Sequence, residues 1–138
     1  MQHKLFDQLP EEAIKIRKTV FVDEQGFYDE FDETDRRAKH IVIFEGKEPI
    51  GTCRFFEDDK KDVYLIGRIA VLKAYRGKKI GAELLKIAEA QIKQYGGKQI
   101  LLHAQQQAAL FYNKQGYDAF GTPDLDQGCP HIWMKKDL

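Results

Sequence analysis

The sequence VYLIGRIAV at residues 63–71, followed by LKAYRGKKIGA at residues 72–82, decides the fold. The first segment is apolar at nearly every position, which is typical of a β-strand covered on both faces. The second segment combines glycines with basic residues. Residues 79–95 then place apolar and charged side chains on opposite sides of a helical wheel. The stretch therefore predicts a central strand that passes through a tight loop into an amphipathic helix.

The loop at residues 76–82 has the composition of an anion-binding turn. A helix N-terminus presents unpaired N–H groups and a partial positive charge, and glycine permits close approach of an anion. Arg76, Lys78 and Lys79 add side-chain charge. The loop has neither the Gly-Lys-Ser/Thr of a nucleoside triphosphatase nor the GxGxxG of a dinucleotide fold. We interpret it as a pyrophosphate cradle; the alternative is a turn that serves only chain reversal and solubility.

Hydrophobic periodicity and turn residues predict the remaining elements. Upstream we expect a helix, a short helix in an acidic and aromatic stretch, and two antiparallel strands, at residues 10–23, 24–39, 40–44 and 50–56. Downstream we expect a strand, a helix and two short strands, at residues 99–104, 105–114, 117–120 and 131–135. Helices separate strands only in the middle of the chain. The prediction is a single α/β domain over residues 1–138 with a mixed sheet, and an ion pair between Glu89 and Lys93 on its long helix.

The composition bears on partners and location. The 22 Lys and Arg residues balance the 22 Asp and Glu residues, and no set of stacking aromatics accompanies the basic pairs, so we expect no nucleic-acid binding. No run approaches the ~20 apolar residues of a membrane span, and residues 1–6 lack the apolar core of a signal peptide. We therefore expect no membrane partner and a cytoplasmic location. The two cysteines and four histidines never fall at ligand spacing, which predicts no metal site and reduced thiols.

Two motifs together resemble the GNAT superfamily of acetyltransferases. They are the strand followed by RGKKIGA at residues 76–82, and AALFYNKQGY at residues 108–117. Further segments are similar to the ElaA/YjcF-like branch: TVFVDEQ at 19–25, GRIAV at 67–71, LHAQ at 102–105 and CPHI at 129–132. The resemblance implies an acyl-CoA N-acyltransferase fold that carries acetyl-CoA as co-substrate and no metal. It also implies an amine acceptor, on a small molecule or a peptide.

The resemblance assigns residues to the cofactor. In this superfamily the central strand splays from its parallel neighbour and its exposed backbone pairs with the pantetheine arm, which here falls to Ile69, Ala70 and Val71. The pyrophosphate is expected on the main-chain amides of Arg76, Gly77, Lys78, Lys79, Ile80, Gly81 and Ala82. The family pattern (Gln/Arg)-x-x-Gly-x-(Gly/Ala) fits Arg76 and Gly81, whereas Lys79 stands where the middle glycine is usual.

Three residues beyond the loop are also matched to family positions. Tyr112 matches the tyrosine that many members use as general acid toward the departing thiolate, and a phenol can donate such a proton. The alternative for Tyr112 is packing between helix and sheet. Gln105 stands where many members carry an asparagine that contacts the pantetheine arm, with helix capping as the alternative. Phe111 is expected beside the cofactor or simply in the core.

The general base is not assigned by the resemblance. Some members carry a glutamate on the central strand, but Gly67 and Arg68 occupy that region here. Histidine titrates nearest neutral pH, which favours the histidines chemically. The candidates are Glu24, Glu30, His103, His131 or a water chain.

The acceptor and the class of activity stay open at this point. The acidic stretch 24–35 would attract a cationic amine, or it is a solvated loop. Arg54 and Arg68 could instead bind a carboxylate or phosphate of the acceptor. Because the usual glutamate is absent, the alternative to a direct-attack acetyltransferase is a non-catalytic acyl-CoA-binding or sensor domain. The oligomeric state, monomer or homodimer, is not fixed by the sequence.

Overall fold

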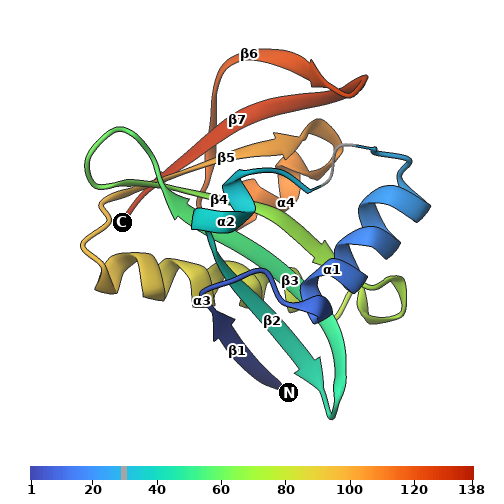
Figure 1. Cartoon of the computed structure of the whole chain (residues 1–138). Coiled ribbons are helices and arrows are strands. Elements are labelled where there is room, and N and C mark those ends of the chain that lie inside the picture. The colour runs from blue at the N-terminus through green and yellow to red at the C-terminus, as the bar shows by residue number, and fades with distance from the viewer. Residues whose placement is uncertain (29–30) are drawn as a thin grey trace.

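A seven-stranded mixed sheet organises the computed structural model, which describes residues 1–28 and 31–138 (Figure 1). The strand order is β1-β2-β3-β4-β5-β7-β6, and only β4 and β5 are parallel. The strands are β1 (Gln2–Phe6), β2 (Lys39–Glu45), β3 (Glu48–Glu57), β4 (Val63–Val71), β5 (Gln99–Gln105), β6 (Asp118–Asp126) and β7 (Cys129–Asp137). The mixed sheet predicted from the sequence is confirmed, with VYLIGRIAV as β4 near its middle.

Helices cover both faces of this sheet. They are α1 (Glu11–Arg17), α2 (Thr34–Arg37), α3 (Ile80–Gln94) and α4 (Ala109–Lys114), with 3₁₀ turns at Lys73–Tyr75 and Gln106–Ala108. The helix predicted at residues 10–23 is present, but after α1 it continues as a π-helix, Lys18–Glu24. Its wider winding is seen where the N–H of Gln25 donates to the carbonyl of Val20, five residues back, at 3.1 Å. Within the described ranges, no helix is both long and apolar enough to cross a membrane.

Alternating side chains on β2 divide the interior into two cores. Ile41 and Ile43 pack with α3 in one core, while Val42 and Phe44 pack with α1 in the other. The helices α1 and α2 lie over one face of the sheet, and α3 and α4 lie over the opposite face (Figure 1). Both faces of the central strands are therefore covered, as the apolar run of β4 predicted.

Two regions differ from the sequence prediction. Strand β1 was not predicted, because four of its five residues are exposed and the segment has no apolar alternation. Strands β6 and β7 are longer than predicted and form a long hairpin closed by Gln127 and Gly128, both at positive φ (50° and 77°). Most of β6 is exposed, so its polar sequence resembled a loop.

The predicted ion pair of Glu89 with Lys93 is wrong. The Glu89 carboxylate instead accepts hydrogen bonds from the Tyr117 hydroxyl at 2.7 Å and from Lys136 Nζ at 3.1 Å. Tyr117 is fully buried and needs a partner for its hydroxyl, which α3 supplies through Glu89. The contact joins α3 to β7, and residue spacing within a helix cannot predict a contact with a distant strand.

Strands β4 and β5 separate after three residue pairs, Val63 with Gln99, Tyr64 with Ile100, and Leu65 with Leu101. On its other side β4 remains paired with β3 through a bulge, in which Arg68 and Ile69 lie opposite a single residue. Arg68 takes the left-handed conformation there, with φ 52°. A bulge bends its strand. The edge of β4 that faces β5 therefore has no strand partner from residue 66 to residue 71, as far as the structure describes the chain.

Candidate active site

A cavity of about 420 Å³ opens where β4 and β5 diverge. Its walls come from β4, the end of β5, α4, the π-helix with the segment after it, and the β6–β7 hairpin. The lining includes Gly67, Arg68, Ile69, Ala70 and Val71 of β4, with Val20, Phe21, Gln25 and Phe27 from the π-helical side. Opposite them lie His103, Gln105, Phe111, Tyr112, Asp126 and His131. Segments distant in the sequence thus meet at the splayed point of the sheet.

The residues matched to cofactor positions separate into two groups. Those at the cavity are Ile69, Ala70, Val71, Arg76, Gly81, Gln105, Phe111 and the matched acid Tyr112. Gly77, Lys78, Lys79, Ile80 and Ala82 are not part of its lining; they form the turn and the first residues of α3. The side chain of Ile80 is 2% exposed and belongs to the core. Only the main chain of Ile80 is available to a ligand.

The turn before α3 leaves a run of main-chain donors without acceptors. For residues 77–82, no hydrogen bond from a backbone N–H to any described residue is formed, and no side chain caps α3. Gly77 and Lys79 both have positive φ, at 80° and 65°. A 15-residue helix adds its dipole to these donors. The turn therefore has the properties of an anion site, with Lys79 in the left-handed conformation that suits glycine.

Gly81 lies in close contact with Phe111. A Cβ atom on Gly81 would lie 3.2 Å from Cζ of the Phe111 ring, closer than ordinary van der Waals contact. The contact joins the first turn of α3 to α4 at the cavity wall. Gly81 thus has a packing role besides the close backbone approach expected from the sequence.

Arg76 fastens the loop to the π-helix. Its Nε donates to the carbonyl of Val71 at 2.9 Å, and its two terminal nitrogens donate to the Glu24 carboxylate at 2.6 and 2.8 Å. The Arg76 hydrogen bonds lower the pKa of Glu24. Among the candidate bases, Glu24 is therefore held as a carboxylate with low proton affinity, which makes it a poor proton acceptor. Sequence reasoning missed this pair because 52 residues separate its members.

Tyr112 presents a phenol to the cavity. Its ring meets Phe111 at 5.0 Å and Tyr117 at 6.2 Å between centroids, both edge to face. Burial raises the pKa of Tyr112 above its ordinary value. Its hydroxyl has no hydrogen-bond partner in the described part of the chain. Tyr112 is thus a protonated donor at neutral pH, with its hydrogen free for a ligand.

Two of the remaining candidate bases lie side by side at the cavity. His103 and His131 both line the cavity, with ring centroids 4.8 Å apart. Glu30 lies outside the described residues. Among residues 1–28 and 31–138, no group of three or more His, Cys, Asp and Glu side chains is placed to hold a metal ion. The two histidines are therefore the titratable bases that the fold brings to the cavity together.

Arg54 is not available to an acceptor. It is 5% exposed, and its Nη1 donates to Asp32 at 2.7 Å and to Asp35 at 2.9 Å. The buried Arg17 also pairs with Asp35, at 2.8 Å. Burial alone would raise the pKa of Asp35, but hydrogen bonds and charge from Arg17 and Arg54 outweigh it and lower the pKa to about 2. The sequence-based role for Arg54 in acceptor binding is thus replaced by a structural one.

Two carboxylates of the acidic stretch, Asp32 and Asp35, are paired with arginines of the sheet and of α1. Asp32 and Asp35 are held by the buried arginines, and Arg68 Nη2 also contacts Asp32 at 3.3 Å. These two carboxylates therefore stabilise the packing of α2 on the sheet and do not form a free wall for a cationic acceptor. Arg68 connects this charge network to the cavity that it lines.

Lys79→Gly is expected to raise the free energy of unfolding by up to about 1 kcal/mol. A left-handed residue other than glycine costs about 1–2 kcal/mol, and the larger freedom of glycine in the unfolded chain offsets about 0.4–1 kcal/mol of the gain. Urea denaturation of both proteins measures the difference. Lys78→Gly, one residue earlier and not at positive φ, is the matched control and should be destabilising. Equal losses in the two variants would contradict the strain at Lys79.

The comparisons with known proteins agree with this geometry. The family model of the acetyltransferase (GNAT) domain matches residues 6–138. The N-acetyltransferase YjcF of Bacillus subtilis, itself uncharacterized, is 37% identical over 130 residues, which span 91% of each chain. A crystal structure from Lactobacillus plantarum, provisionally assigned as an N-acetyltransferase, superposes with a TM-score of 0.90 at 31% identity over 99% of this chain and 97% of its own. Escherichia coli ElaA superposes with a TM-score of 0.87 at 25% identity over 98% of each chain.

Proposed function

The chain belongs to the GNAT family of acetyltransferases, within its ElaA/YjcF-like relatives, and from this premise we propose that it transfers the acetyl group of acetyl-CoA to a primary amine. The acceptor is a small molecule or a peptide, and the amine attacks the thioester directly while both substrates are bound. Acyl-CoA-dependent acetyltransferase activity is the activity of the family. The proposal adds two points: acetyl-CoA is the donor, and the amine attacks the thioester directly.

The observation that carries the proposal is the unpartnered edge of β4 beside the turn before α3. The pantetheine arm carries amide groups that can pair with the free backbone of Ile69, Ala70 and Val71. The pyrophosphate would accept hydrogen bonds from the N–H groups of residues 77–82, at the positive end of α3. Gln105 and Phe111, at the cavity wall, would flank the arm.

Tyr112 supplies the proton that the reaction needs at sulfur. The amine nitrogen forms a bond to the thioester carbon, and collapse of the resulting intermediate breaks the carbon–sulfur bond. A thiolate is a better leaving group when a donor protonates it as it departs. The Tyr112 phenol is protonated, has no hydrogen-bond partner among the described residues, and belongs to a residue that lines the cavity. Both thiols of the chain are free, which suits a reducing compartment, and the proposal places the reaction in the cytoplasm.

A thiol-release assay with acetyl-CoA tests the proposal. Spermidine, benzylamine, glucosamine, L-lysine and a lysine-containing peptide form a panel of amines that differ in charge, size and shape. At least one of them should accelerate the appearance of free CoA thiol, with the acetylated amine found by mass spectrometry. Calorimetry with acetyl-CoA runs in parallel. Binding of acetyl-CoA with no amine-stimulated release across the panel would contradict the proposal and support a non-catalytic acyl-CoA-binding domain.

A further inference from the structure

His131 carries a free basic nitrogen at the cavity. Its Nδ1 lies 2.8 Å from the carbonyl oxygen of Cys129. A carbonyl only accepts hydrogen bonds, so Nδ1 of the neutral ring holds the hydrogen and Nε2 holds the lone pair. The residue is only 6% exposed, it lines the cavity, and Nε2 has no partner among residues 1–28 and 31–138. The fold therefore fixes both the tautomer and the place of this imidazole.

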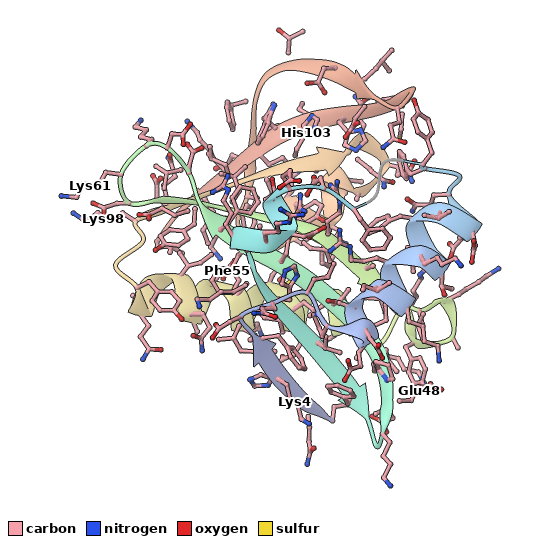
Figure 2. The ribbon with its side chains drawn as sticks, in the orientation of Figure 1. Lys4, Glu48, Phe55, Lys61, Lys98 and His103 are labelled. Carbon is pink, nitrogen blue, oxygen red and sulfur yellow. The ribbon has the colours of Figure 1, made fainter. Side chains whose placement is uncertain are left out.

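A second imidazole and a carboxylate stand beside it. The strand register places Gln105 and Asp124 opposite His131, and Trp133 opposite His103, so these side chains share one face of the sheet. His103 Nε2 lies 2.7 Å from Asp124 Oδ1, and its ring stacks on Trp133 at 4.6 Å. Figure 2 labels His103 at this place, where β5 runs beside β7. Asp124 therefore brings a negative charge next to the paired rings.

We propose that His131 is the general base that takes the proton from the acceptor amine, in place of the glutamate absent from β4. The inference rests on the proposed function and deepens it. The Asp124 carboxylate accepts the Nε2–H of His103, which fixes the tautomer and the orientation of that ring, and its negative charge lies beside the imidazolium that forms on His131.

Proton transfer in the proposed reaction passes through His131 and Tyr112. An alkylammonium acceptor gives one proton to Nε2 of His131, and the neutral amine then attacks the thioester carbon. Collapse of the intermediate breaks the carbon–sulfur bond, and Tyr112 gives its proton to the sulfur. The amide nitrogen loses its second proton, which returns to the phenolate of Tyr112, and the imidazolium of His131 releases its proton to water. The products are the acetylated amine, CoA thiol and one proton.

Other charged groups face this site from every strand around it, and they bear on its pH dependence. The titratable and charged groups at or beside the cavity are Arg68 and Arg76 from the β4 side, Glu24 beside Arg76, His103 on β5, Tyr112 on α4, and Asp124 and Asp126 on β6.

His131→Asn is the decisive variant. The asparagine amide can occupy the place of Nδ1 and donate to the Cys129 carbonyl, while the basic Nε2 is lost. With the most active amine of the panel, kcat/KM at pH 7 should fall by about 10²-fold or more. The deficit should shrink by about tenfold per pH unit as the pH rises toward the pKa of the amine, because the amine then arrives neutral. Acetyl-CoA affinity by calorimetry should not change.

Two controls separate a base from a structural residue. His3→Asn, in the exposed strand β1, should leave the whole pH profile unchanged. The wild type gives a second measurement: its kcat/KM, corrected for amine protonation, should decline as the solution is made acidic, because a general base must be unprotonated to accept a proton.

Four outcomes would overturn the inference. The first is a wild-type kcat/KM, corrected for amine protonation, that does not change with pH. The second is a loss of kcat/KM in His131→Asn that stays constant with pH and is accompanied by weaker acetyl-CoA binding. If the wild type is active and His131→Asn has the same kcat/KM, His131 is not the general base, and the proposed function stands. Absence of amine-stimulated release by the wild type would remove the proposed function and this inference together.

Discussion

Tyr112→Phe is expected to lower kcat for acetyl transfer by about 10²- to 10⁴-fold. The substitution deletes only the hydroxyl, so the edge-to-face contacts with Phe111 and Tyr117 are kept. The hydroxyl bonds to no described residue, and its loss should not destabilise the fold. Acetyl-CoA affinity should be retained, because the expected pyrophosphate and pantetheine contacts lie on other residues. Thiol release at saturating amine, with calorimetry for binding, measures both quantities.

The pH dependence of Tyr112 has a definite sign. The acid must be protonated, and burial raises the pKa of Tyr112, so kcat should not decline from loss of this proton below about pH 10. Tyr28→Phe is a matched control, because Tyr28 is 77% exposed and uses its backbone N–H for its hydrogen bond to Gln127. A Tyr112→Phe variant with wild-type kcat would show that another group protonates the thiolate.

Asp35→Asn is expected to lower the free energy of unfolding by about 3–5 kcal/mol. Asp35 accepts hydrogen bonds from two arginines, Arg17 at 1% and Arg54 at 5% exposure. Removing the carboxylate charge leaves both buried guanidinium groups without enough negative charge beside them. Arg54 Nε already has no hydrogen-bond partner among the described residues. Urea denaturation measures the loss. Asp7→Asn, which affects only the exposed pair with Lys39, should cost less than about 1 kcal/mol.

Acid should reproduce part of this effect in the wild type. The pKa of Asp35 is lowered to about 2 in the folded protein, so its contribution is complete above the ordinary carboxyl pKa and is lost as the pH falls through about 2. Asp35→Asn should therefore lose less stability than the wild type between pH 4 and pH 2. Equal losses over that interval would contradict a stabilising charge at Asp35.

The elements on which the site depends could be predicted from the sequence, because each has a local signature. The apolar run of β4, the glycine-containing turn and the amphipathic α3 follow from periodicity and loop composition. The same holds for the hairpin of β2 and β3. The family motif added Tyr112 and Gln105, and both lie at the cavity.

Contacts between distant segments could not be predicted. Arg54 looked available for an acceptor because nothing local shows that Asp35 of α2, and Asp32 just before that helix, pack against it. The pairing of Arg76 with Glu24 and of Glu89 with Lys136 has the same origin. The two histidines meet because the register of β5 with β7 places Gln105, two residues after His103, opposite His131. The register of a strand pair cannot be read from the sequence of either strand alone.

The separation of β4 from β5 makes the sheet two half-sheets joined at three residue pairs. In the empty protein, water must satisfy the backbone groups along the gap. A bound CoA thioester would replace this water and link the halves, and a ligand that binds only the folded state at a hundredfold excess over its Kd adds about 2.7 kcal/mol to stability. Resistance of the chain to proteolysis would then report how much of the thioester the cell contains.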